Sequence, residues 1–347
     1  MAQAVAEPAI FTRQTNNSAI ARFARFFGTL AKRKPLGFVS LLVLLFLVVL
    51  AIAPQLFATH GPADTNAGAR LQNYCLGPRN TFLCPTTVED SAISGKRVVE
   101  GSLSEPFGTD QLQRDVFSRT IYGARWAIYI GLIAVTISSL LSLAIGVTCG
   151  YFGGKYDATA QRFVDAIMAL PALVVLLALP QMIGSWDIDG PFWLDKPSIT
   201  FFKLALVLGI LGGAGGSRVI RSAVIGVRSA QYLEAARVIG CRDSRIMIRH
   251  VVPNIFGPLM VQATIGLGGV ILAEAALSFL GFGVVDPNKP TWGQMLNQAQ
   301  VLASVRVQGV IWPGIFIALA VFSFNMLGDA LRDLLDPRLR GARGNFG

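Results

Sequence analysis

Charged residues are scarce in this sequence. Asp, Glu, Lys and Arg together make up 14% of its 347 residues, whereas hydrophobic residues make up 53%. A soluble domain usually contains about 25% charged residues. That much apolar side chain cannot be buried in one globular core. The composition therefore excludes an ordinary soluble domain and indicates a protein that lies in a lipid bilayer.

Residues that catalyse reactions or bind metals are scarce as well. The chain has two histidines, His60 and His250, which the topology below places on opposite sides of the membrane. This separation excludes a histidine pair for a metal, and we find no cluster typical of a membrane-embedded enzyme. The stretch "GGKY" (153–156) resembles the tail of a nucleotide-binding loop, but Tyr156 stands where such a loop needs Ser or Thr to bind magnesium. We interpret it as a tight turn and expect no ATP site in this chain.

Long apolar runs are what the sequence does contain. A membrane-spanning helix requires about 20 predominantly apolar residues. Pro171, Pro180 and the glycine cluster 212–216 interrupt two of the runs, and membrane helices tolerate such breaks. The sequence predicts an all-α polytopic membrane protein with six transmembrane helices, at about 36–57, 127–151, 164–182, 202–219, 255–281 and 310–331.

The basic residues give the orientation, because Lys and Arg accumulate on the cytoplasmic side of membrane proteins. Of the 30 Lys and Arg residues, 19 lie in segments 1–35, 152–163, 217–254 and 332–347. Both ends of the chain are therefore expected in the cytoplasm. The net charge of +10 flanks the membrane, which argues against nucleic acid as a partner. The predicted organisation is a leader (1–35), a first helix (36–57), an outer segment (58–125), a core of five helices (126–331) and a tail (332–347).

Two features of the expected topology leave alternatives open. Cys75 and Cys84 lie in the outer segment, which faces an oxidising compartment, so they form either a disulfide or two reduced thiols. Glu274 is the only acidic residue well within a predicted span. A carboxyl group there is either functional, as in the ion site of a secondary transporter, or bonded to a neighbouring helix.

Residues 231–254, "QYLEAARVIGCRDSRIMIRHVVPN", carry too many charges to cross a bilayer and are expected in the cytoplasm. Glu234, Ala235, Ala236 and Arg237 favour a helix, and Gly240 permits the positive φ that ends it. A second short helix follows, and Pro253 prevents a straight helical run into the fifth span. The pattern predicts a helix–turn–helix finger, with an amphipathic loop on the inner leaflet as the alternative.

The finger also carries a family resemblance. Glu234-Ala235-Ala236, Gly240 and the later "HVVPN" (250–254) resemble the EAA loop of permease subunits in bacterial binding-protein-dependent ABC importers. Further motifs are similar to the dipeptide/oligopeptide/nickel group, in particular its second permease of the DppC/OppC-like type. They are "FGTDQLQRDVFSRTIYGAR" (107–125), "AEAALSFLGFGV" (273–284), "PTWGQML" (290–296) and "NMLGDALRDLLDPRLRG" (325–341). The resemblance covers about residues 30–341. Gln113 departs from it, since the family usually has glycine there.

The resemblance implies a function and a set of partners. The chain would form half of the pathway for di- or oligopeptides in the bacterial inner membrane, beside a homologous second permease of the DppB/OppB-like type. A periplasmic solute-binding protein would deliver the cargo, and one or two cytoplasmic ATPase subunits would drive its transport. ATP and magnesium would be bound by those ATPase subunits, so the chain itself would need no cofactor and would not be an enzyme.

The resemblance also implies which residues act. The residues that couple the chain to the ATPase would be Glu234, Ala235, Ala236 and Gly240, with Arg237 and Arg245 beside them. In the outer segment, Asp110, Arg114, Asp115 and Arg119 are spaced by four and five positions. They are expected either to pair with one another or to contact the binding protein. Glu274 would belong either to the translocation path or to the structure of the helix bundle.

Overall fold

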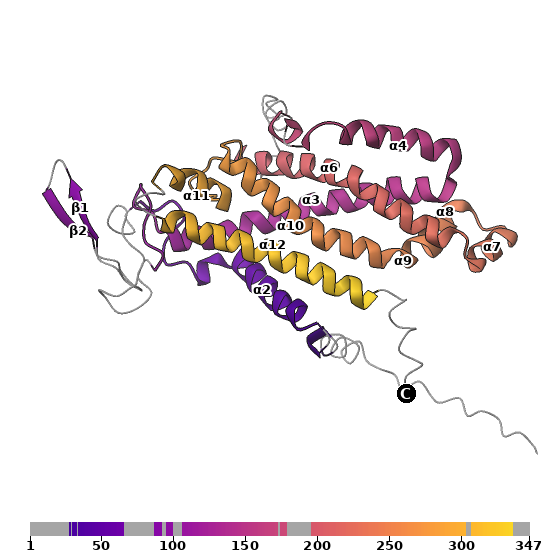
Figure 1. Cartoon of the computed structure of the whole chain (residues 1–347), viewed down its shortest axis with the longest axis horizontal. Helices are drawn as coiled ribbons and strands as arrows, with labels where there is room; N and C mark the ends of the chain where they lie inside the picture. Colours follow the sequence, from indigo (N-terminus) through magenta and orange to yellow (C-terminus); the bar gives the residue numbers. More distant parts are fainter. Residues whose placement is uncertain are drawn as a thin grey trace, which may run out of the picture.

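A computed structural model of the chain describes residues 28, 30–32, 34–65, 87–91, 95–99, 106–172, 174–178, 196–302 and 307–335. Within these ranges, five helices are long and apolar enough to cross a membrane. They are α2 (Pro35–Ile52), α3 (Val116–Phe152), α6 (Lys196–Arg228), α10 (Phe256–Phe279) and α12 (Gln308–Leu335). The five run side by side along the long axis of the molecule (Figure 1). The predicted helical membrane fold is confirmed.

Shorter elements lie at the two ends of this bundle. At one end are the 3-10 turn η1 (Pro54–Leu56), the antiparallel hairpin of β1 (Thr87–Ser91) and β2 (Gly95–Val99), the helix α11 (Trp292–Ala299) and the 3-10 turn η3 (Gln300–Leu302). At the opposite end are α7 (Gln231–Val238), α8 (Asp243–Ile246), the π-helical turn η2 (Met247–Val251) and α9 (Val252–Asn254) (Figure 1). The hairpin is the one sheet among the described residues, and the all-α prediction did not include it.

The third predicted span, 164–182, is not confirmed. The helix α4 (Gly154–Met168) ends at Met168, inside the predicted range, and residues 179–182 lie outside the described residues. Pro171 explains the early end, because a proline disfavours helical geometry in the residue before it. The described part of the chain thus contains five helices of spanning length rather than six.

The helix α4 is held to α6 by ion pairs. Arg221 of α6 pairs with Asp157, and Arg218 of α6 pairs with Asp165. The turn that leads into α4 is the tight turn expected at "GGKY", with positive φ at both Gly153 and Gly154. The two paired carboxylates mark α4 as a polar helix packed against α6.

Close packing of α3 on α6 forms the centre of the bundle. A Cβ atom added at Gly146 of α3 would lie 2.7 Å from Cβ of Ile220, and one at Gly213 of α6 would lie 2.7 Å from Cβ of Leu141. Small residues let membrane helices approach in this way. The glycine cluster 212–216 therefore does not interrupt the fourth span, contrary to expectation, because α6 runs through it unbroken and uses it for packing.

The helix α3 is longer than predicted. It begins at Val116 rather than near residue 127, so the predicted boundary between outer segment and core falls inside a helix. Asp115 caps its start, since its carboxylate accepts hydrogen bonds from the backbone nitrogens of Phe117 (3.0 Å) and Ser118 (2.9 Å). With 37 residues, α3 is about 55 Å long and extends well beyond the roughly 30 Å core of a bilayer.

The helix α2, by contrast, has 18 residues and is fixed at both ends. At its start, Lys34 pairs with Asp333 of α12. At its end, the guanidinium group of Arg125 in α3 donates hydrogen bonds to the carbonyl oxygens of Ala51 (2.9 Å) and Ile52 (3.0 Å). One face of α2 packs on the bundle and the other is exposed as a lipid-facing surface, which includes Leu42, Leu45, Phe46 and Val49.

Candidate functional sites

Residues 231–254 form the predicted helix–turn–helix finger, which we call the finger from here on. In it, α7 carries the Glu-Ala-Ala sequence, and Gly240 follows with a φ of 79°. The finger ends with the π-helical turn η2 and α9, and a break at Ile255 separates it from α10. Pro253 accounts for the irregular turn η2, because it cannot donate the hydrogen bond to the Arg249 carbonyl that a continuous α-helix needs.

The finger is seated on the bundle through a few apolar side chains. Leu233 and Ala236 of α7 and Ile246 of α8 are buried, and they pack with Ile220 and Val224 of α6. Ala236, one of the expected coupling residues, therefore contacts this chain itself and is 5% exposed. One face of α7 anchors the finger to α6.

The opposite face of the finger is uncovered. Glu234, Ala235 and Gly240 are exposed, and the Glu234 side chain makes no ion pair with any described residue. Val238 and Ile239 are 87% and 78% exposed, beside a hollow lined in part by Arg245. Exposed apolar side chains beside charged ones are typical of a surface that binds another protein.

A polar contact joins the finger to the end of α3. The Tyr151 hydroxyl donates a hydrogen bond of 2.6 Å to Oδ1 of Asp243 at the start of α8. The Arg237 guanidinium lies 5.1 Å from the centre of the Tyr151 ring, and its Nε donates to the hydroxyl at 3.5 Å. Tyr151 thus connects both helices of the finger to α3. Sequence reasoning missed Tyr151, because nothing in its local pattern distinguishes it from other aromatic residues at a helix end.

At the other end of the bundle, the charged residues of the outer segment lie in two adjoining networks. Asp110 accepts hydrogen bonds from Nε of Arg114 at 2.7 Å and from Nη1 of Arg119 at 3.4 Å. Asp115 instead caps α3 and accepts a hydrogen bond from the Thr59 hydroxyl at 2.9 Å. Residues 110–114 form a turn rather than a helix, and the backbone nitrogens of Leu112 and Arg114 donate hydrogen bonds to the Asp110 carboxylate.

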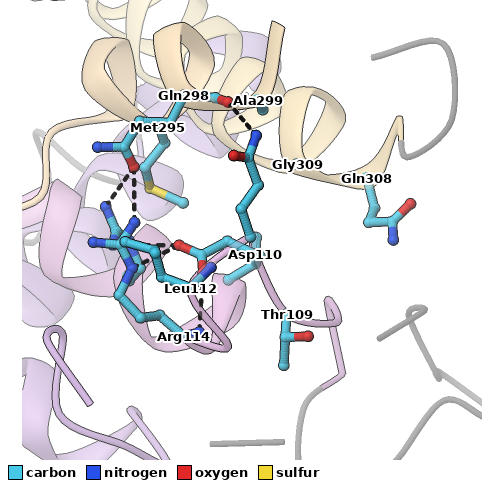
Figure 2. A pocket seen from close by; sticks show the side chains of 12 residues that line it. Thr109, Asp110, Leu112, Arg114, Met295, Gln298, Ala299, Gln308 and Gly309 are labelled. Carbon is cyan, nitrogen blue, oxygen red and sulfur yellow. Dashed lines mark hydrogen bonds and ion pairs between the residues drawn. The ribbon is translucent and has the colours of Figure 1, made fainter. Parts of the chain in front are cut away.

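Gln298, at the end of α11, completes the first network. Its Oε1 accepts hydrogen bonds from Nη2 of Arg114 (3.0 Å) and from Nη2 of Arg119 (3.2 Å), as Figure 2 shows beside Asp110. No sequence signal pointed to Gln298, because 184 residues separate it from Arg114. Only the fold brings the two together.

Glu274 lies in α10 and is 2% exposed. Its carboxyl group accepts a hydrogen bond of 2.6 Å from the Ser278 hydroxyl, one turn further along α10. The helix α11 packs closely on this part of α10, since a Cβ atom added at Gly293 would collide with the carbonyl oxygen of Ala275. Cys75 and Cys84, the predicted disulfide candidates, lie outside the described residues.

Comparisons with known proteins fit this architecture. Residues 142–341 match the family model described as the binding-protein-dependent transport system inner membrane component. The chain belongs to this family. It is therefore a multi-pass inner-membrane subunit of a transport system, and the resemblance seen in the finger and the four other motifs is confirmed.

Individual relatives show which members of this family the chain is similar to. It is 32% identical over 323 residues to the dipeptide transport system permease protein DppC of Alkalihalophilus pseudofirmus, covering 93% of this chain and 92% of the relative. It is 32% identical to the oligopeptide transport system permease protein OppC of Bacillus subtilis, covering 69% of this chain and 74% of the relative. Among solved structures, the methionine ABC transporter MetNI in inward-facing conformations matches with a TM-score of 0.46 and 16% identity, covering 61% of this chain and 96% of that one.

Proposed function

We propose that the chain forms half of the translocation pathway of an ABC importer for di- or oligopeptides, together with a homologous second permease. Two relatives named as dipeptide and oligopeptide permeases support the peptide cargo. In this proposal a periplasmic binding protein delivers the peptide. Separate cytoplasmic ATPase subunits bind ATP and magnesium, and this chain has no ATPase site of its own.

In this proposal the finger receives the motion of the ATPase. The observation that carries the assignment is the division of α7 into a face anchored by Leu233 and Ala236 and an exposed face with Glu234 and Ala235. Glu234 pairs with a basic group of the ATPase, and Gly240 sets the bend of the finger. Arg237 and Arg245 lie beside this contact. Because the finger contacts the ATPase in the cytoplasm, both ends of the chain face the cytoplasm in this proposal. The network of Asp110, Arg114 and Arg119 then faces the opposite side of the membrane.

The alternative of a secondary transporter coupled through Glu274 finds no support. The relatives are permeases of ABC systems. Moreover, Glu274 is 2% exposed, and its carboxyl group is hydrogen-bonded to Ser278 within the same helix. We assign it a structural role in the helix bundle.

Glu234→Arg tests the coupling assignment. We expect the variant to assemble normally but to lose most ATP-driven peptide uptake, because a cation replaces the carboxylate that faces the ATPase and like charges repel each other. The measurement is uptake of a labelled dipeptide and ATP hydrolysis by the complete transporter in proteoliposomes, with the binding protein present.

Gln231→Arg is the control for a new arginine on α7, since Gln231 is also exposed there; it adds one unit of positive charge, whereas Glu234→Arg adds two. This control is expected to retain uptake. Uptake by Glu234→Arg equal to that of the unmodified transporter would contradict the coupling role. Co-purification of the complex in mild detergent tests the partners independently, and recovery of the chain without an ATPase would overturn the proposed function.

A further inference from the structure

A pocket of about 230 Å³ lies at the outer end of the bundle, next to the Asp110 network. Its walls come from the turn at residues 109–114, the start of α3, the end of α11 and the start of α12 (Figure 2). Leu112, at the rim of the pocket, is 57% exposed, so the pocket is open to solvent. We call it the outer pocket.

The charges that line the outer pocket do not balance. Two guanidinium groups contribute to its wall, and Arg114 and Arg119 are only 5% and 1% exposed. Asp110 is the single acidic residue among the described residues that line it. One positive charge therefore lacks a carboxylate partner within this lining, and a charge removed from water is costly unless it is paired.

Gln298 occupies the position that suits a second hydrogen-bond acceptor for the two arginines. Its amide oxygen lies within hydrogen-bond distance of both guanidinium groups, at 3.0 Å and 3.2 Å. An amide oxygen is neutral, so it accepts a hydrogen bond from each guanidinium group but does not neutralise the positive charge. A carboxylate forms shorter and stronger hydrogen bonds with guanidinium groups and can accept two at once. An anionic ligand could therefore take the place of the Gln298 amide.

The remaining wall of the outer pocket is apolar. Val116 and Met295 are buried in it, and Ala299 and Leu112 line it nearer the surface. A carboxylate next to a small apolar group is what the C-terminal residue of a peptide presents. We propose that the outer pocket binds the C-terminal carboxylate of a peptide at Arg114 and Arg119, with the last side chain against this apolar wall. The inference rests on the proposed peptide cargo.

The experiment measures peptide binding to the complete transporter in nanodiscs without the binding protein. The probe is the dipeptide Ala-Ala, observed by saturation-transfer difference NMR, and Ala-Ala amide is the matched ligand that lacks the carboxylate. We expect Ala-Ala to bind and the amide to bind at least about tenfold more weakly, which corresponds to about 1.4 kcal/mol.

Gln298→Glu should also weaken Ala-Ala binding by about tenfold or more, because the new carboxylate pairs with the two arginines in place of the ligand. Gln300→Glu adds the same charge at an exposed site two residues further along and should leave binding unchanged. Equal binding of the dipeptide and its amide, or unchanged binding to Gln298→Glu, would overturn the inference.

The same variants separate this inference from two other outcomes. If Ala-Ala does not bind but Gln298→Glu weakens docking of the peptide-loaded binding protein, the outer pocket accepts an acidic side chain of that protein and the inference is wrong. ATP-driven uptake by the unmodified transporter is measured in parallel. Uptake without direct Ala-Ala binding refutes the pocket alone, whereas absence of uptake for every peptide tested refutes the proposed function.

Discussion

At the scale of single residues, Gln113 departs from the pattern of the resembling family, and its backbone is strained. Among the described residues it is the only one other than glycine with a positive φ, at 62°. It stands in the turn that Asp110 closes, at the position where the resembling family usually has glycine. A side chain in this left-handed conformation costs roughly 1–2 kcal/mol, which glycine avoids.

Gln113→Gly should therefore stabilise the protein by about 0.5–1 kcal/mol, after the greater flexibility of glycine in the unfolded chain is counted. Gln113→Val should destabilise it, because a β-branched residue tolerates positive φ least. The measurement is the thermal unfolding midpoint of the purified complex in detergent. Leu112→Gly, at the exposed neighbour without a positive φ, is the control and should lower the midpoint. A lower midpoint for Gln113→Gly would show that the turn is not strained.

Residue-level prediction from the sequence was best where the residues belong to one short motif. Glu234, Ala235 and Ala236 lie on one helix, and Gly240 has the positive φ expected of it. Their local pattern was sufficient, except that the burial of Ala236 against α6 depends on contacts far away in the sequence. Gln298 and Tyr151 could not be found in this way, because their partners lie 184 and 92 positions away.

At the scale of elements, the contact between the finger and α3 has a measurable consequence. Tyr151→Phe removes the hydrogen bond to Asp243 and keeps the ring under Arg237. We expect the finger to remain folded but to transmit motion poorly, so that more ATP is hydrolysed per peptide transported. A hydrogen bond to a charged group contributes about 1.5–3 kcal/mol, enough to change this ratio several-fold.

The measurement is the ratio of ATP hydrolysed to peptide taken up in proteoliposomes. Asp243→Asn should shift the ratio in the same direction, and the double variant should add little, because both changes remove one contact. Tyr156→Phe is the control, since the Tyr156 hydroxyl lies at an exposed site and contacts only Thr148 among the described residues. An unchanged ratio in Tyr151→Phe would assign the contact to stability alone.

Elements were predicted well where hydrophobicity alone determines them. The helices α2, α10 and α12 lie close to their expected ranges, because each is a single apolar run. The third span is not confirmed, because α4 ends at Met168, near the beginning of the expected range, and its Asp165 pairs with Arg218 of α6. The extension of α3 before residue 127 was missed because Arg119 and Arg125 interrupt its apolar pattern and its start is set by the cap at Asp115.

At the scale of the whole molecule, the helices differ greatly in length. The helix α3 is about 55 Å long, whereas the 18 residues of α2 span about 27 Å. Both ends of α2 are fixed, by Lys34 with Asp333 and by Arg125 with the last carbonyl groups. These contacts tie both ends of α2 to neighbouring helices.

This difference makes α2 the part of the molecule most sensitive to hydrophobic mismatch. In a thick bilayer, a short helix must thin the surrounding lipid, and each ångström of mismatch has a cost. Uptake by transporters reconstituted in phosphatidylcholines of increasing acyl-chain length should pass through a maximum and then fall, and uptake independent of chain length would contradict this. The shortest helix, rather than the longest, would then determine which membranes this protein can work in.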